Sequence, residues 1–161
     1  MNTLEAITSR RHIKQFKPDA VSEDLLKKWL SAASFAPNHR MVEPWKVLVV
    51  GPETRAALKH GANFGEAPVV LAFLSQTSEN PIDRDENLIA TCAFIQNFCL
   101  AAWNEGVGTR WTSIGTKQGT RDILQVPDQY EVVEILGVGY PNEVPLAKER
   151  TPITNKLDYL P

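Results

Sequence analysis

The feature that most constrains this chain is a long uncharged run near its middle. No charged residue occurs between Glu86 and Glu105, and the run has no turn-forming proline or glycine. Large apolar side chains recur at spacings that surround nearly the whole circumference of a helix, namely Leu88, Ile89, Cys92, Phe94, Ile95, Phe98, Leu100 and Trp103. A helix over residues 84–105 would therefore need apolar cover on both sides rather than on one stripe.

A membrane or a second protein surface could provide this cover. Polar residues interrupt the run, among them Asn87, Thr91 and Gln96, and it is slightly shorter than the roughly 20 apolar residues of a membrane span. In one small domain, the simplest remaining cover is another copy of the chain. We therefore expect a homodimer with this helix at its interface, and no association with a membrane.

The rest of the chain reads as one compact domain over residues 1–161. Apolar patterning and capping residues predict helices at 3–9, 22–36, 52–60 and 116–124, and strands at 45–50, 68–74, 109–113 and 131–138. Residues 141–161 form a proline-rich tail that still carries Leu146, Ile153 and Leu157. We expect this tail to be laid across a surface, which could be that of the partner subunit.

Charge and composition exclude several classes of function. Seventeen Lys and Arg against nineteen Asp and Glu give a net charge of -2, which argues against nucleic acid as the main partner. The start of the chain, Met1 to Glu5, has neither the basic residues nor the apolar run of a secretory signal, so we expect a cytoplasmic protein. With three histidines and no metal-ligand spacing, we expect no metal site.

Two basic clusters stand at opposite ends of the chain. The first contains Arg10, Arg11, His12 and Lys14, and the second contains Lys148 and Arg150. If the fold brings them together, they would form a set of donors suited to a phosphate group. Solvated basic surface is the alternative interpretation, since charge runs usually lie in solvent.

Two further segments place polar groups beside flat apolar surface at the end of an element. One is the loop Pro37, Asn38 and His39, and the other is the stretch Arg110, Trp111 and Thr112. Both have ordinary structural interpretations as well, because a loop histidine often bonds to backbone and a tryptophan usually belongs to the core.

The order of these motifs resembles the FMN-dependent nitroreductase family over almost the whole chain. The similarity comprises an Arg-Arg start, an Ala-Pro-x-His loop followed by Pro-Trp, a long apolar helix, a Leu-Gly-x-Gly-Tyr-Pro strand end and a terminal Lys-x-Arg. It implies an α+β fold with a mixed β-sheet flanked by helices. It also implies an intertwined homodimer, built on a long central interface helix, that holds two FMN molecules.

The resemblance assigns a role to each candidate residue. It implies that Arg10, Arg11 and His12 meet the FMN phosphate and ribityl chain, and that Lys148 and Arg150 form the terminal phosphate-binding pair. Lys14 would reach the N1/O2 edge of the flavin. The other subunit would contribute Pro37, Asn38 and His39, and the backbone of Arg110, Trp111 and Thr112 would lie near the ring, where an amide commonly meets N5.

The implied activity is that of an NAD(P)H oxidoreductase with ping-pong kinetics. NAD(P)H would reduce FMN and leave, and a small-molecule electron acceptor such as a nitroaromatic or a quinone would then bind in its place. Because the flavin carries the chemistry, no catalytic side chain is required. Other chemistry on the same fold, such as reductive dehalogenation or flavin–oxygen chemistry, is an alternative, as is a non-catalytic module that binds flavin or phosphate.

Several positions depart from the family pattern. His12 replaces the usual serine, Met41 an asparagine and Glu43 a glutamine, and the short segment 61–67 suggests a site without a lid helix. If the central helix forms a shared interface, substitution of Phe94 or Phe98 by aspartate should give a monomer that has lost FMN.

Overall fold

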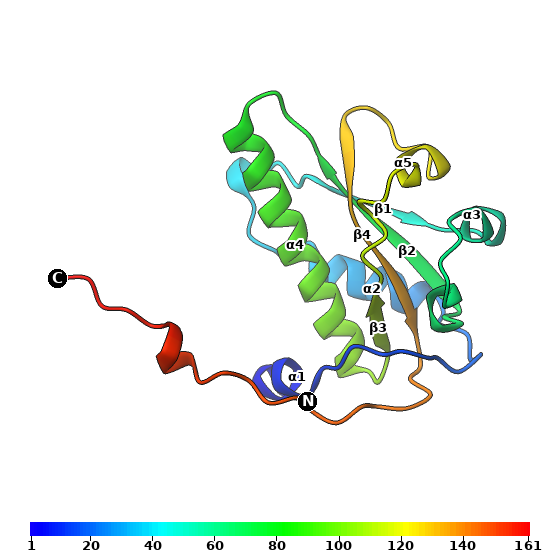
Figure 1. Ribbon diagram of the computed structural model, residues 1–161, viewed down its shortest axis with the longest axis horizontal. Helices are drawn as coiled ribbons and strands as arrows, with labels where there is room; N and C mark the ends of the chain where they lie inside the picture. Colours follow the sequence, from blue (N-terminus) through cyan, green and yellow to red (C-terminus); the bar gives the residue numbers. More distant parts are fainter.

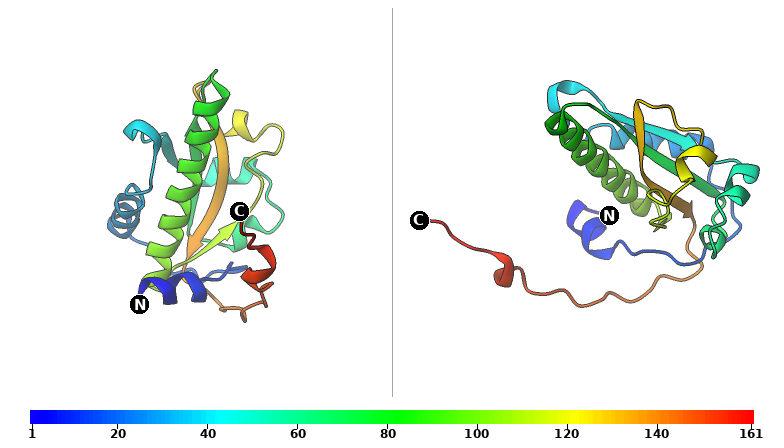
Figure 2. Two further views of the ribbon diagram at one scale, coloured as in Figure 1. Left: turned by 90° about the vertical axis from the view of Figure 1, so that its left-hand side faces the viewer. Right: turned by 45° about the horizontal axis from the view of Figure 1, so that its top comes forward.

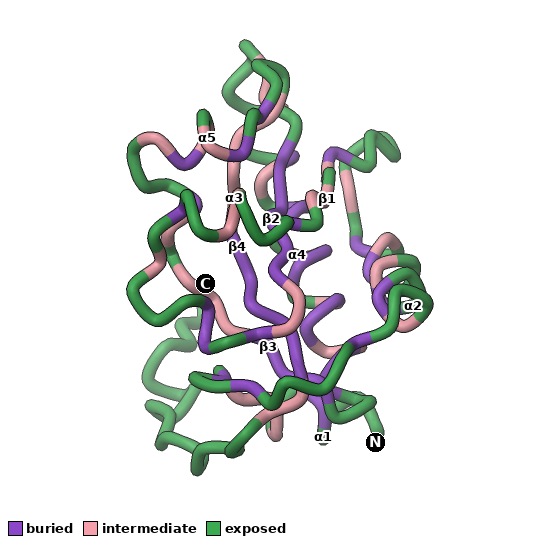
Figure 3. The backbone as a smooth tube through the Cα atoms, turned by 90° about the vertical axis from the view of Figure 1, so that its right-hand side faces the viewer, coloured by how far each residue is buried: buried purple, intermediate pink, exposed green.

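A single four-stranded sheet organises the computed structural model, which describes residues 1–161 (Figure 1). The strands lie in the order β1-β2-β4-β3, with bounds β1 (Trp45–Val49), β2 (Val69–Gln76), β3 (Gly108–Trp111) and β4 (Tyr130–Gly139). The two central strands, β2 and β4, are rich in apolar residues, and they are the most buried of the four (Figure 3). This agrees with the expected α+β fold.

All three strand pairings are antiparallel. The mixed sheet implied by the resemblance is reduced, within one chain, to a single parallel bridge between His12 and Thr109 at the β3 edge. The N-terminal segment cannot extend this bridge into a strand because it bends away beyond Ile13. Phe16 N–H donates to the carbonyl of Gly65 at 2.9 Å, and Lys17 N–H donates to that of Tyr140 at 2.9 Å.

Helices cover both faces of the sheet (Figure 2). One face carries α2 (Glu23–Ala33) and α4 (Pro81–Asn104). The other carries the shorter pieces α3 (Pro52–Ala57), η2 (Asn63–Gly65) and α5 (Thr120–Ile123). The remaining elements are α1 (Thr3–Ser9), η1 (His39–Met41) and η3 (Ile153–Lys156).

Several helices are shorter than the sequence predicts. The helix that begins at Pro52 ends at Ala57 because Lys59 adopts a left-handed conformation, with φ of 48°. The helix predicted at 116–124 reduces to α5, since Gly119 has φ of 84° and interrupts it. In contrast, α4 begins three residues earlier than predicted, with Asn80 as its N-cap and Pro81 in its first turn, where proline is favoured.

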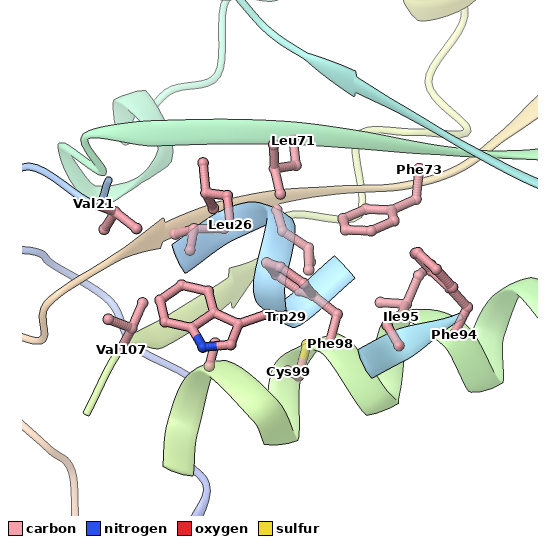
Figure 4. Close-up of a cluster of buried hydrophobic side chains, with 14 of the residues drawn as sticks. Val21, Leu26, Trp29, Leu71, Phe73, Phe94, Ile95, Phe98, Cys99 and Val107 are labelled. Carbon is pink, nitrogen blue, oxygen red and sulfur yellow. The ribbon is translucent and has the colours of Figure 1, made fainter. Parts of the chain in front are cut away.

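The larger core cluster lies between the sheet and the α2–α4 layer. Trp29 of α2 and Phe98 of α4 meet edge to face with ring centroids 6.3 Å apart, and Phe73 of β2 lies 5.7 Å from Phe98 (Figure 4). All three side chains are fully buried. This packing fixes the position and direction of α4 on the sheet.

The outer side of α4 has no cover within the chain. Ile82 is 70% exposed and Ile89 is 64% exposed, and Cys92 lies on the same side. Phe94 and Phe98 face the opposite way, into the chain's own core, so the expectation that they form the dimer interface is wrong. Aspartate at either position would unfold the domain, because the sheet lies beneath it. None of the helices combines the length and hydropathy needed to cross a membrane.

The C-terminal tail first stays against the body of the domain, where Asn142 N–H donates to the carbonyl of Gln15 at 3.1 Å, and it extends away beyond Pro145 (Figure 1). Its apolar side chains are almost bare, with Leu146 93% exposed, Tyr159 88% and Leu160 91%. An extended segment with this much exposed apolar surface needs a covering partner.

Candidate functional site

The first basic cluster lies along the β3 edge of the sheet. Ile13 N–H donates to the carbonyl of Thr109 at 3.0 Å, and this bond docks residues 10–14 beside β3. Because Ile13 points into the core, its neighbours His12 and Lys14 remain exposed. Arg11 behaves differently, since its guanidinium donates to the carbonyl of Thr8 at 2.8 Å and to that of Arg10 at 2.9 Å. Arg11 therefore closes the end of α1 rather than facing a ligand.

The other cations of this cluster lie close together without an acidic partner. The pKa of His12 is lowered from 6.5, first by partial burial and then by the positive charges of Arg110, Arg10 and Lys14. None of these three cations takes part in any of the chain's ion pairs. A protein of net charge -2 thus groups three cations without ion pairs at one edge of its sheet. Such a cluster favours an anionic ligand.

Arg110 connects β3 with the neighbouring turn. Its guanidinium donates to the backbone carbonyl of Lys14. With Lys14, Gly65 and Glu66, it lines a pocket of about 460 Å³, whose other lining residues are Gln15, Ala62, Asn142, Glu143 and Pro145. Two of the three cations without an ion pair, Lys14 and Arg110, thus line this pocket together with the carboxylates of Glu66 and Glu143.

The rest of the predicted stretch 110–112 is occupied by structural contacts. Trp111 packs against the α4 core. Thr112 donates its hydroxyl to the carbonyl of Ile135 at 2.7 Å and its N–H to the Glu134 carboxylate at 3.4 Å. The amide of Thr112 is therefore already engaged within the chain, and the expectation that the backbone of residues 110–112 lies near a flavin ring stays a prediction.

Free backbone donors follow immediately after this stretch. The N–H groups of Ile114, Gly115 and Thr116 donate to no acceptor in the chain. Gly115 is buried, and its N–H belongs to a class of group that nearly always has a partner in folded proteins. The sequence analysis missed these residues. A glycine directly after a short strand was the only available signal.

A left-handed turn forms the opposite wall of the pocket. Asn63, Phe64, Gly65 and Glu66 all have positive φ angles, between 41° and 72°. Arg55 holds this turn, donating to the side chain of Asn63 at 2.9 Å and to its carbonyl at 2.7 Å. Within residues 61–67 the only helical element is the one-turn η2.

His60 also supports this turn. Phe64 N–H donates to Nδ1 of His60 at 2.8 Å, and the two rings stack with centroids 4.5 Å apart. The hydrogen bond requires Nδ1 to be unprotonated. The pKa of His60 is lowered from 6.5, first by burial and then by the charges of Arg110 and Arg55. Because its pKa is lower in the folded protein than in the unfolded chain, neutral His60 stabilises the fold. This contribution to the unfolding free energy is fully present above about pH 6.5, and it is lost as the pH falls through the folded-state pKa.

We therefore expect the thermal midpoint of the protein to fall as the pH is lowered from about 6.5. His60→Asn should reduce this acid sensitivity, because its side-chain oxygen can accept the Phe64 N–H without titrating. His12 also has a lowered pKa and contributes with the same sign. Unfolding curves between about pH 5 and 8 for the wild type, His60→Asn and the variant that also carries His12→Asn check this. Superimposable acid profiles for the wild type and His60→Asn would contradict it.

The loop Pro37–His39 lies at the other end of the molecule. His39 lines a small pocket with Asp83 and Glu86, which lie at the start of α4. The first basic cluster follows α1, which contacts the opposite end of α4, where Trp103 Nε1–H donates to Ser9 Oγ at 2.9 Å. By helix rise, Glu86 and Trp103 are roughly 25 Å apart. One chain therefore does not bring this loop to the first basic cluster.

The loop is held by local hydrogen bonds of the Asn38 side chain. The side chain of Asn38 accepts the N–H of Glu43 at 2.9 Å and donates to the carbonyl of Ala36 at 3.3 Å. Pro37 and His39 are exposed, and Met41 is 75% exposed. Their side chains are thus available to another surface.

The second basic cluster stays separate from the first. Lys148 and Arg150 are both exposed in the extended tail. Neither makes a hydrogen bond or an ion pair with the rest of the chain. The predicted set of phosphate donors is consequently not assembled within a single chain. No group of three or more His, Cys, Asp or Glu side chains could hold a metal ion.

Comparison with known proteins decides the family. A family model described as the nitroreductase family matches residues 7–60 and 54–140, which include the β3 edge, the left-handed turn and the loop after β3. The chain belongs to the nitroreductase family. This confirms the resemblance inferred from the ordered motifs.

Relatives with similar lengths support the nitroreductase assignment. The Bacillus subtilis protein YfhC, whose name places it among NAD(P)H nitroreductases, is 32% identical, with 94% of this chain and 91% of that protein covered. A Methanothermobacter thermautotrophicus protein named for NADH dehydrogenase and NAD(P)H nitroreductase is 30% identical, with 90% of this chain and 80% of that protein covered.

A solved structure shows the same nitroreductase fold. The nitroreductase-like family protein from Bacillus cereus superposes with a TM-score of 0.91 at 30% sequence identity, covering 99% of this chain and 96% of that chain. The similarity spans both faces of the sheet and the tail.

Proposed function

We propose that this protein is a cytoplasmic, FMN-dependent NAD(P)H oxidoreductase that works as a homodimer. The observation that carries the proposal is the group of cations Arg10, Lys14 and Arg110, which have no acidic partner and lie at the same sheet edge as the loop with three unpaired backbone N–H groups. Membership of the nitroreductase family supports it. Relatives named as NAD(P)H nitroreductases indicate the reductant.

The residues present suit a flavin mononucleotide. Its phosphate is an anion that Arg10 and the neighbouring His12 can bind, and the positive charge of Lys14 and Arg110 favours the negative charge of a reduced ring. The unpaired N–H groups of Ile114 and Gly115 can donate to acceptor atoms of the ring. Bound flavin would supply the hydride chemistry between a nicotinamide and an electron acceptor. The protein's own residues bind and orient it, and no side-chain acid is required.

A shared site between two subunits explains the residues that one chain leaves apart. The exposed side of α4, with Ile82 and Ile89, is apolar and uncovered. Two α4 helices paired antiparallel about a two-fold axis would place the start of one beside the end of the other. Loop Pro37–His39 of one subunit would then approach residues 10–14 of its partner. This supports the proposed contribution of that loop to the partner's flavin.

The same arrangement accounts for the tail. Beyond Pro145 the tail carries exposed apolar side chains and extends away from its own domain, so we propose that it wraps the partner subunit. The phosphate-binding role of Lys148 and Arg150 depends on this wrapping, because neither residue contacts the first basic cluster within its own chain.

For the second substrate, we propose a small-molecule acceptor such as a nitroaromatic or a quinone. Residues 61–67 form only the short turn with η2, and a segment this short supports an open site that admits flat molecules of different kinds. Ping-pong kinetics follow if the nicotinamide and the acceptor use the same face of the flavin in turn.

The visible spectrum of the purified protein tests this function. We expect flavin absorption bands, either as purified or after addition of FMN, and we expect them to bleach when NADH or NADPH is added without oxygen. Subsequent addition of a quinone or a nitroaromatic should restore them. A protein that binds no FMN would refute the proposal. Bands that persist with both nicotinamides would instead indicate a flavin-binding protein with another reductant or no turnover.

A further inference from the structure

The side chain of Glu134 is a buried carboxylate that no part of the proposed function uses. It lies on β4 and is only 7% exposed. No Lys, Arg or His forms an ion pair with it. Instead, its Oε1 accepts the N–H groups of Ile135 at 2.8 Å, Ser113 at 3.0 Å and Thr112 at 3.4 Å. A buried charge of this kind is stable only when such donors are held in place.

Two of these donors belong to the loop that follows β3. Ser113 has φ of 56°, a left-handed conformation that is costly for a residue with a side chain. The bond from its N–H to Glu134 offsets this strain. Glu134 thereby determines how the chain turns after β3.

The loop then packs directly on the backbone of β4. A Cβ atom at Gly115 would lie 3.3 Å from the Cα of Glu134 and 3.3 Å from the carbonyl oxygen of Val133. The β2–β4 ladder changes register at this point, where Phe73 pairs with Glu134 but Leu74 pairs with Val132. The irregular strand and the carboxylate together form the base on which the loop rests.

We propose that Glu134 is a positioning residue for the flavin. By engaging the N–H groups of Thr112 and Ser113, its carboxylate sets the turn after which the N–H groups of Ile114 and Gly115 remain free to donate to an acceptor atom of the ring. This inference rests on the proposed function, because it assigns those two donors to FMN. The carboxylate itself does not touch the flavin.

The test compares two substitutions of Glu134 that separate its geometry from its charge. Glu134→Leu removes the acceptor, whereas Glu134→Gln removes the charge but keeps an acceptor oxygen. The same pair of substitutions at Glu131 provides the control, since Glu131 lies on the same strand and pairs with Arg84 at the surface. Hydrogen–deuterium exchange of residues 112–116 in the FMN-free protein measures the loop. The Kd for FMN and the N5 resonance of ¹⁵N-labelled FMN report whether the N–H groups of Ile114 and Gly115 still donate to the flavin.

We expect Glu134→Leu to accelerate exchange in the loop, weaken FMN binding by roughly tenfold and shift the N5 resonance. Glu134→Gln should rescue loop exchange and the N5 resonance, and it should raise the flavin midpoint potential because a negative charge has been removed. Neither Glu131 variant should change the N5 resonance. Unchanged exchange and unchanged FMN affinity in Glu134→Leu would overturn the proposal.

The two proposals fail in different ways. A wild-type protein that binds no FMN overturns the proposed function and the assignment of the donors, while loop exchange still reports on Glu134. If Glu134→Leu does not fold, Glu134→Asp carries the test, because it keeps the charge but draws the carboxylate back from the loop. Wild-type exchange and a wild-type N5 resonance in Glu134→Asp would then count against positioning by Glu134.

Discussion

Replacement of Gly65 by alanine should be among the most damaging single changes in this protein. Gly65 has φ of 72°, and a Cβ atom there would lie 2.2 Å from the carbonyl oxygen of Lys14 and 3.2 Å from Nη1 of Arg110. The backbone oxygen cannot yield as a flexible side chain would. Left-handed strain and overpacking together should cost about 2–4 kcal/mol of unfolding free energy, which corresponds to a fall of roughly 4–16 °C in Tm.

The change should also damage the site, because the residues that the methyl group displaces are those that carry the cations. Lys14 and Arg110 meet at this point, and Phe16 N–H bonds to the carbonyl of Gly65. FMN binding by the folded fraction of Gly65→Ala should therefore weaken as well, which titration with FMN below its Tm measures.

Gly61→Ala is the matched control for this prediction. Gly61 belongs to the same segment, but a Cβ atom there would meet nothing within 4 Å. Its unfolding free energy should stay within about 0.5 kcal/mol of wild type. Equal stability of Gly65→Ala and Gly61→Ala would show that the close approach to Lys14 does not constrain the fold.

Sequence reasoning succeeded where one chemical pattern extends over many residues. The uncharged run 87–104 predicted a long helix, and α4 confirms it; one side of α4 lies in the core, and the predicted cover of the other side by a second subunit stays a prediction. The β-branched and aromatic runs likewise predicted all four strands, with errors of a residue or two at their ends. Such patterns can be recognised in the sequence because the periodic burial of a helix or strand selects apolar residues along its whole length.

Sequence reasoning could not determine which side of α4 faces the sheet and which side is left exposed. Phe94 and Phe98 are larger than Ile89, but they face the sheet because they complete the cluster with Trp29 and Phe73. The direction depends on the packing of distant segments, and no local pattern contains it. The same limit applies to Arg11, whose guanidinium turns back onto α1, whereas Lys14 of the same basic cluster lines the pocket.

The candidate site was only partly predictable for a related reason. Basic residues are visible as a cluster in the sequence, so Arg10 and Lys14 were singled out, whereas Arg110 was named as part of the polar stretch 110–112. Free backbone N–H groups have no signature of their own, because their availability depends on where the chain turns. The loop after β3 turns as it does because Glu134 lies on another strand, 21 residues beyond Ser113. Glu134, between Val133 and Ile135 in an otherwise largely apolar strand, was the only trace of this in the sequence.

Replacement of Ile89 by aspartate should convert the proposed dimer into a folded monomer. Ile89 is 64% exposed on the bare side of α4, so its own chain gains nothing from the isoleucine. A two-fold interface would bury two unpaired carboxylates, and each costs about 3–5 kcal/mol. The dimer dissociation constant should therefore rise at least about a thousandfold. Sedimentation equilibrium measures this, while circular dichroism should show an intact fold.

The monomer should also lose FMN, because each site would lack the loop Pro37–His39 and the tail of the partner. Ala56→Asp provides the control, since Ala56 is exposed on α3, on the other face of the sheet, and gains the same charge. It should remain dimeric and flavin-bound. Ile89→Asp protein that sediments as a dimer would show that this side of α4 is not the interface. A monomer with wild-type FMN affinity would show that one chain builds the complete site.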